Sequence, residues 1–331
     1  MGLSYGEHEP GPAEEVDEAV RRRALFGVAS VALFGAPVLG EVLELPVRPA
    51  TPTPLPSRLV ASDVEVMRNL TAGLRGVARQ YGGCADVVTG TARRSLALLS
   101  VPATDQVGAG MRRAVGELHT LAGWCCVDSG LADAAGAHFA KAMQLGDLSA
   151  ALRHAGIQMC DEGAYNDGLK AFQLALVNAD DPWLHLETAL PLAAMGQPQA
   201  AMSAAAKGCE GPPVDGFDAA DMDYSISRVY HRLGDLDRAE ALAASSVGKW
   251  SKVPDAKRDR VEADIALAAI HIEEGTYYGP TLASRAIDSV MPLRSVRSRA
   301  KLMWLIRALE TRGGSTCDDL ARQARLVYQR V

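Results

Sequence analysis

The sequence predicts an all-α protein in which helical hairpins stack into a solenoid. Glycines in the same local setting recur at spacings of 33, 33, 38 and 41 residues, at Gly130, Gly163, Gly196, Gly234 and Gly275. A spacing in this range is typical of a repeated helical pair. The composition agrees, because 48% of the residues are hydrophobic and only 5% are aromatic. Such a core is built from alanine, leucine and valine, which favours closely packed helices over an all-β fold.

Within each repeat, an apolar helical pattern runs up to the glycine and a second helical pattern follows it. Two consecutive units align at a constant offset of 33 residues, which pairs Gly123 with Gly156 and Phe139 with Phe172. We expect each repeat glycine just past the first helix, in the left-handed conformation that ends a helix cheaply. Small residues are expected where the two helices approach closely, at Ala135, Gly168, Ala201 and Ala239.

Three segments precede the predicted solenoid. Residues 1–16 are polar and contain glycine and proline, which predicts a disordered tail. Residues 17–45 are predicted to form an apolar helix, and residues 46–58 a proline-rich, extended linker.

The apolar segment allows a second interpretation. Arg21, Arg22 and Arg23 precede an apolar run over 24–40, which resembles a secretory or twin-arginine signal. The alternative is a cytoplasmic apolar helix that packs on the end of the solenoid. The run is short for a membrane span, so we expect no membrane-embedded protein.

Residues 59–331 are predicted to form the solenoid. Ser62 and Asp63 suggest an N-cap for a helix over 64–83, and Thr104 is expected to open a long helix into the first repeat. A final helical pair is expected to cap the apolar end of the stack. The repeat units are expected at about 116–147, 149–180, 182–213, 220–252 and 261–291, and the cap at 294–331.

Charge and motifs exclude several classes of function. The net charge of −6 and the pI of about 5.7 give no support for a nucleic-acid-binding surface. The six cysteines include no CxxC pair, and no cysteine and histidine set has metal-ligand spacing. Phosphate-binding, zinc-protease and serine-hydrolase motifs are absent from the sequence. We therefore expect no enzyme, no cofactor and no metal site.

The first unit carries the clearest family resemblance. Gly123, Gly130, Ala135, Phe139 and Ala142 follow an order of small and aromatic positions that resembles the tetratricopeptide repeat. The match is also strong in the second unit and weakens in later ones. The resemblance implies a right-handed α-solenoid whose first helices line a concave groove.

The tetratricopeptide frame implies which side chains face the groove. Its arginines are expected to hold a carboxylate or a peptide backbone, and its aromatic residues to supply apolar contact. The alternative is a groove whose charges are solvated or paired within the chain. The implied groove residues are Trp124, Asp128, Arg153, Ile157, Asp161, Leu186, Leu190, Tyr224, Arg228 and Arg232.

A broader resemblance covers most of the chain. Residues 2–4, 21–25, 78–83 and 117–124 resemble one group of actinobacterial regulators, which join a Cro/repressor-type helix-turn-helix domain to a tetratricopeptide-like sensor. This resemblance implies a role in transcriptional regulation and a cytoplasmic location. The helix-turn-helix domain itself is absent from the sequence, so we expect no direct DNA binding by this chain.

Three functions follow as hypotheses. The first is a non-enzymatic regulatory or sensor module that binds a peptide, a small signal or a partner protein in the groove. The second is a scaffold that acts through protein–protein contacts or forms a homodimer through its N-terminal apolar helix. The third is a protein exported through residues 21–40. The flexible linker would also permit the N-terminal segment to occupy the groove.

Overall fold

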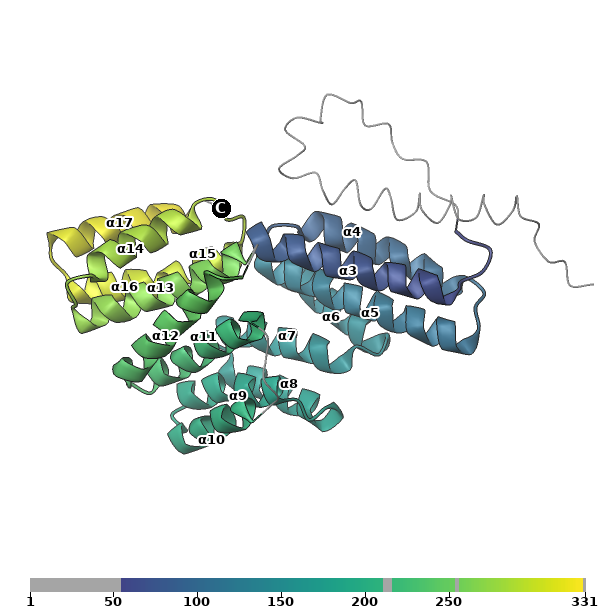
Figure 1. The fold of residues 1–331 in the computed structure, drawn as a ribbon, viewed down its shortest axis with the longest axis horizontal. Helices are drawn as coiled ribbons and strands as arrows, with labels where there is room; N and C mark the ends of the chain where they lie inside the picture. The colour runs from purple at the N-terminus through teal and green to yellow at the C-terminus, as the bar shows by residue number, and fades with distance from the viewer. Residues whose placement is uncertain (1–54, 211–215, 254–255, 330–331) are drawn as a thin grey trace, which may run out of the picture.

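The computed structural model describes residues 55–210, 216–253 and 256–329 of the chain (Figure 1). The predicted tail, the apolar helix and most of the proline-rich linker therefore lie outside the described residues. The end of the linker, residues 55–58, forms neither helix nor strand. Every regular element within the described ranges is a helix, so the all-α prediction is confirmed.

Six hairpins follow one another between residues 105 and 328 and form a solenoid of tetratricopeptide-like units. The helices α3 (Ala61–Tyr81) and α4 (Ala85–Ser95) and the 3-10 helix η1 (Leu96–Ser100) precede them and pack against the first hairpin. A short helix, α15 (Val296–Ala300), joins the last two hairpins. The hairpins are α5 (Asp105–Asp128) with α6 (Ala132–Gln144), α7 (Leu148–Asp161) with α8 (Tyr165–Asn178), α9 (Pro182–Ala194) with α10 (Pro198–Cys209), α11 (Gly216–Arg232) with α12 (Leu236–Trp250), α13 (Lys257–Glu274) with α14 (Gly279–Val290), and α16 (Leu302–Arg312) with α17 (Ser315–Tyr328).

The repeat glycines end the first helices as predicted. Gly130, Gly163, Gly196, Gly234 and Gly275 have φ angles of 75°, 85°, 73°, 80° and 75°. A side chain is strained in this left-handed region, whereas glycine enters it freely. The conformation lets the chain reverse within a few residues and begin the second helix of each hairpin.

The starts of the first two long helices show one error and one success of the sequence prediction. Ser62 and Asp63 are not the N-cap of α3, because the helix begins at Ala61. Asp63 instead acts from inside the first turn, where its Oδ2 accepts a 2.8 Å hydrogen bond from the backbone N–H of Val60. Thr104 caps α5 as predicted, accepting from the backbone N–H of Val107.

The aromatic positions of the repeat pack on glycines within their own hairpins. Phe139 is 2% exposed and lies against Gly123, where an added Cβ would come within 2.5 Å of the ring. Phe172 lies against Gly156 with the same separation. The constant offset in the sequence therefore reflects one repeated contact, in which a missing side chain on the first helix makes room for a ring from the second.

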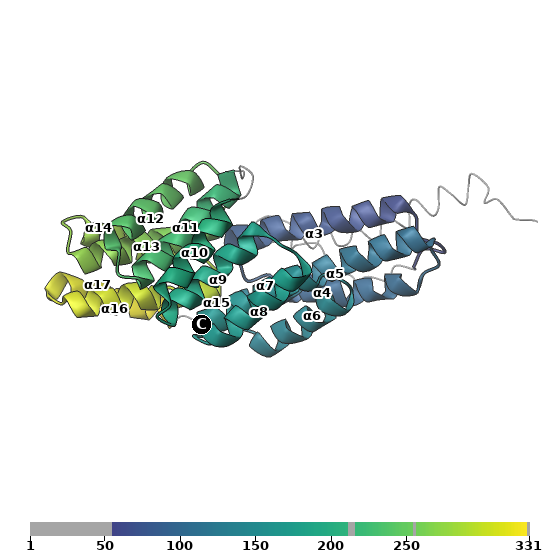
Figure 2. The ribbon, with the colours of Figure 1, turned by 90° about the horizontal axis from the view of Figure 1, so that it is seen from below.

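The two ends of the solenoid meet. Helix α13 packs against α3, and α15 packs against α5, although the intervening hairpins separate them widely in sequence. Figure 1 shows the C-terminal helices, in yellow and green, reaching the N-terminal helices, in blue, above the central hairpins. From below, α3, α5 and α6 extend from one end of the molecule and α13 to α17 from the other (Figure 2). The concave side is therefore enclosed by helices of this same chain.

Candidate ligand-binding cavities

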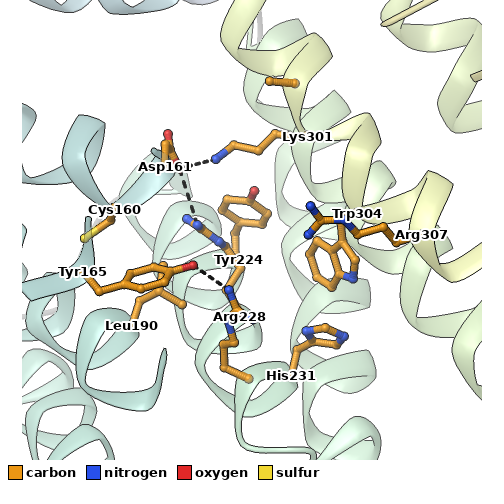
Figure 3. Close-up of a pocket in the computed structure, with 12 residues that line it drawn as sticks. Cys160, Asp161, Tyr165, Leu190, Tyr224, Arg228, His231, Lys301, Trp304 and Arg307 are labelled. Atoms are coloured by element: carbon orange, nitrogen blue, oxygen red, sulfur yellow. Dashed lines mark hydrogen bonds and ion pairs between the residues drawn. The ribbon is translucent and has the colours of Figure 1, made fainter. Parts of the chain in front are cut away.

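Two cavities lie on the concave side. The larger has a volume of about 370 Å³, and its lining residues lie on α3, α5, α7, α9, α11, α13 and α15. The smaller has a volume of about 210 Å³ and is bounded by α7, α8, α9, α11, α15 and α16 (Figure 3). Tyr224 and Arg228, both on α11, line the two cavities. The larger cavity is lined by Arg75, Ala78, Arg79, Thr120, Leu121, Trp124, Arg153, His154, Ile157, Trp183, Glu187, Asp221, Tyr224, Ser225, Arg228, Arg258, Asp259, Glu262 and Arg297.

Most of the residues that the tetratricopeptide frame implied lie at these cavities. Trp124, Arg153 and Ile157 line the larger one, together with Tyr224 and Arg228. Three more of the implied residues, Asp161, Leu190 and Arg232, line the smaller cavity.

Leu186 and Asp128 line neither cavity. Leu186 is 2% exposed and lies in a core cluster with Ala189 and Val229. It packs against Gly208, where an added Cβ would come within 2.6 Å of the Leu186 Cβ. Asp128 is 2% exposed beneath the junction between the two ends of the solenoid.

The Asp128 carboxylate joins three separate segments. Its Oδ1 accepts hydrogen bonds from the Ser295 hydroxyl at 2.6 Å and from Arg258 Nη1 at 3.2 Å. Its Oδ2 accepts from the backbone N–H of Gly83 at 3.2 Å. Gly82 and Gly83 both have positive φ, and a Cβ on Gly82 would lie 2.3 Å from this carboxylate. Gly82 is therefore required for close approach to Asp128, and Gly83 for close approach to Arg294.

A second carboxylate, Asp161, holds α15 and the start of α16 against the middle of the solenoid. Arg297 Nε donates to its Oδ2 at 2.7 Å, and Lys301 Nζ donates to its Oδ1 at 2.5 Å. Arg228 lies 3.6 Å from the same carboxylate (Figure 3). Burial alone would raise the pKa of Asp161, but these three cations hold it well below its usual range.

The charges of α13 and α15, which line the larger cavity, were not among the groove residues that the sequence implied. Glu262, which is 5% exposed, accepts from Arg297 Nη1 at 2.9 Å and from the Ser298 hydroxyl at 2.7 Å. Arg258 donates to Asp259 Oδ1 at 3.0 Å from Nη2. The available signal was a set of charges at the start of a helix that is otherwise apolar, followed by a basic run over 294–301. Charges that are buried must be paired, so these were candidates for contacts within the chain.

Arginines also cover the aromatic walls of the larger cavity. Guanidinium carbons lie 4.8 Å from the Trp124 ring centroid, 5.2 Å from that of Trp183 and 5.6 Å from that of Tyr224. The three arginines are Arg297, Arg153 and Arg228, respectively. Distances below about 6 Å give favourable cation–π contacts. Arg153 is fixed further by Glu187, whose Oε1 accepts from its Nη2 at 2.7 Å.

Carboxyl groups crowd one side of the larger cavity. Burial raises the pKa of Asp221 to about 7, and the negative charges of Glu187, Asp259 and Glu262 add to this rise while Arg153 opposes it. Burial also raises the pKa of Asp259 above its ordinary value, although Arg258 opposes the rise.

The smaller cavity contains a histidine and a cysteine. His231 Nε2 lies 2.7 Å from Glu273 Oε2, and the His231 ring packs 4.4 Å from that of Trp304. Burial raises the pKa of Cys160 to about 12, so its thiol is protonated at neutral pH. In the part of the chain that the structure describes, no three histidine, cysteine or acidic side chains are grouped as metal ligands. No described helix combines the length and apolar character that crossing a membrane requires.

Comparisons with known proteins give a likeness of fold only. No protein-family model matches the sequence, and no curated protein matches it. The chain is similar to the crystal structure of yeast Tom70, with 12% identity, a TM-score of 0.45, and coverage of 96% of this chain and 75% of that one. It is also similar to the TPR domain of P58(IPK), with 12% identity, a TM-score of 0.22, and coverage of 82% and 95%, respectively. These TM-scores lie below 0.5, so the assignment of a tetratricopeptide-like solenoid rests on the hairpins themselves.

Proposed function

We propose that this chain is a non-enzymatic binding module that takes a peptide, a small signal or a segment of a partner protein into its larger cavity. The observation that carries the proposal is the cavity of about 370 Å³, in which side chains from seven helices converge. Cavities of this size are the usual ligand sites of proteins, and this one combines apolar wall residues with many polar and charged groups that could orient a ligand.

The position of the cavity suggests a sensor. Its wall includes Arg79 of α3, Arg258 of α13 and Arg297 of α15, which belong to the two ends of the solenoid. A ligand bound there would contact both ends, and its affinity would differ between an enclosed and an opened arrangement. Differential affinity is what couples binding to a change of shape. The cavity is thus suited to convert the presence of a ligand into a change that a partner recognises.

We connect this sensor to the regulation of transcription in the cytoplasm. The support is the resemblance of residues 78–83 and 117–124 to the sensor regions of actinobacterial regulators. Residues 78–81 end α3, and residues 117–124 lie on α5, so both segments belong to helices that line the larger cavity.

The test is to fill the cavity without disturbing its ion pairs. Ser225 lines the larger cavity, and we expect Ser225→Phe to reduce its volume. The matched control is Ser284→Phe on α14, which changes a serine that lines a separate surface pocket. Each purified chain is incubated with lysate, and bound proteins, peptides and small molecules are identified by mass spectrometry. We expect one species to be retained by the wild type and Ser284→Phe and lost from Ser225→Phe. Equal recovery of every species from all three chains would reject the cavity as the binding site.

A further inference from the structure

Four of the six arginines that line the larger cavity, Arg153, Arg228, Arg258 and Arg297, form ion pairs with carboxylates of the same chain. Arg153 directs both Nε and Nη2 to Glu187, at 3.1 and 2.7 Å. Two other arginines of the cavity also face carboxylates, which come from other helices or, for Arg258 and Asp259, from the same helix. These pairs are Arg258 with Asp128 and Asp259, and Arg297 with Asp161 and Glu262. An anionic ligand would compete with carboxylates that already hold these groups at short distances.

In contrast, several carboxyl oxygens at the larger cavity can still accept hydrogen bonds. The Asp221 carboxyl lines the cavity and makes no hydrogen bond or ion pair with any described residue. Asp259 Oδ2 is buried and also has no hydrogen-bond partner. Glu187 uses only Oε1 for both of its bonds from Arg153. A buried acceptor without a donor, such as Asp259 Oδ2, is costly, and the half-buried Asp221 carboxyl faces the cavity, so this side is suited to a ligand that supplies donors.

These carboxyls are brought together by the order of the helices. Glu187 lies on α9, Asp221 on α11 and Asp259 on α13, and α11 packs against both of the others. The groups that face Asp221 are Arg79 from α3, Arg153 from α7, Glu187 from α9, and Asp259 and Glu262 from α13, so three carboxyls and two arginines surround it. A pKa of about 7 for Asp221 is the expected result of this crowding. A cation placed among these carboxyls would reduce the repulsion between their negative charges.

The geometry favours an organic cation over a metal ion. The described residues contain no group of three or more histidine, cysteine or acidic side chains that could hold a metal. The same cavity has apolar surface from Leu121, Trp124, Ile157 and Trp183. A protonated amine fits this combination, because its N–H groups donate to the carboxyls while its carbon atoms contact the apolar wall.

On the premise that this cavity binds a ligand as proposed above, we propose that the ligand carries a protonated amine on an apolar or aromatic group, with Asp221 as its principal acceptor. Glu187 and Asp259 flank the ammonium group, and Trp124 and Trp183 contact the carbon portion. A small free amine and the N-terminus of a peptide share this chemistry.

Isothermal titration calorimetry of the full chain at pH 8 tests the proposal with four probes. Phenethylamine represents a small amine, and the tripeptide Phe-Ala-Ala represents a free peptide N-terminus. The same tripeptide with an acetylated N-terminus and phenylacetate, which replaces the ammonium by a carboxylate, are the controls. We expect binding of at least one of the two amines and of neither control. Phenethylamine binding identifies a small-amine site, and binding of the free tripeptide alone identifies a peptide end.

Two variants on the same helix assign the acceptor. Asp221→Asn should weaken binding of the amine by roughly 10- to 100-fold, since a charge-assisted hydrogen bond is lost. Asp223→Asn is the matched control, because Asp223 pairs with Lys249 at 2.6 Å and does not line the cavity. Circular dichroism confirms that both variants are folded. For the wild type and phenethylamine, whose ammonium group is protonated at both values, we expect weaker binding at pH 6 than at pH 8 and release of a proton on binding at pH 6, and neither effect in Asp221→Asn.

Several results would overturn the proposal. Binding of phenylacetate without either amine would reject the ligand chemistry and leave the proposed binding function standing. Equal affinities in Asp221→Asn and Asp223→Asn would reject Asp221 as the acceptor. Failure of all four probes would reject the amine inference alone, because the proposed function is judged separately by the Ser225→Phe experiment.

Discussion

Arg258 on α13 donates a 3.2 Å hydrogen bond to Asp128 on α5, across 130 residues of sequence. The two side chains are only 6% and 3% exposed. The Ser295 hydroxyl and the Gly83 backbone N–H bind the same carboxylate. This contact joins the two ends of the solenoid and makes Asp128 a structural residue, where the tetratricopeptide frame implied a residue open to a ligand.

The first prediction concerns this junction. Asp128→Ala should lower the free energy of unfolding by about 3–5 kcal/mol, because the buried Arg258 charge keeps only Asp259 as a partner and the Ser295 and Gly83 donors lose their acceptor. Urea denaturation followed by circular dichroism measures the loss. The control is Asp167→Ala, which removes an exposed partner of Lys170 and should cost less than about 1 kcal/mol. Similar midpoints for the two variants would contradict the structural role of Asp128.

The second prediction concerns the repeated contact between glycine and phenylalanine. Gly123→Ala places a Cβ 2.5 Å from the Phe139 ring, so we expect a loss of about 1–3 kcal/mol through overpacking. Gly136→Ala, on α6 of the same hairpin, meets no atom within 4 Å and should stabilise the helix by about 0.5–1 kcal/mol. Thermal unfolding of both variants gives the comparison. Changes of the same sign would argue against the close approach at Gly123.

The third prediction concerns acid. Burial lowers the pKa of His154 to about 3, and that of His119 to about 4. The unfolded chain therefore binds protons below pH 6.5 that the folded chain excludes, and this contribution to stability is lost as the pH falls from 6.5 toward these lower values. His154→Gln should reduce the slope of unfolding free energy against pH by up to about 1.4 kcal/mol per pH unit. Denaturation between pH 6.5 and 4.5 measures both slopes, and identical slopes would contradict a neutral, half-buried His154.

The fourth prediction concerns Asp221 in the absence of ligand. Its folded-state pKa of about 7 lies above the ordinary value of 3.8, so the folded chain holds a proton that the unfolded chain has released. Wild-type stability therefore decreases as the pH rises from 3.8 to about 7 through this group. Asp221→Asn removes the effect, and we expect it to be more stable than the wild type by more than about 1 kcal/mol at pH 8. The gain should shrink toward pH 5. A variant that is less stable than the wild type at pH 8 would show that the Asp221 carboxylate is satisfied within the chain.

The sequence by itself determined the helical class and the hairpin units. A glycine that ends the first helix and a phenylalanine that packs on a glycine depend on contacts within one repeat, so they recur at a fixed spacing. The same local frame placed Trp124, Arg153 and Tyr224 on the concave side. Helix caps are also local, and the difference at Asp63 arose because one carboxylate can cap a helix from either of two positions.

Only the tertiary structure decided what occupies the concave side. The curvature that brings α13 to α3 and α15 to α5 is the sum of small rotations between neighbouring hairpins, and no single repeat encodes it. As a result, Arg258, Arg297 and Lys301 meet Asp128 and Asp161 from distant parts of the chain. Burial then distinguishes two of the carboxyls, because three cations hold the pKa of Asp161 low, while Asp221, which has no hydrogen-bond or ion-pair partner among the described residues, holds its proton up to about pH 7.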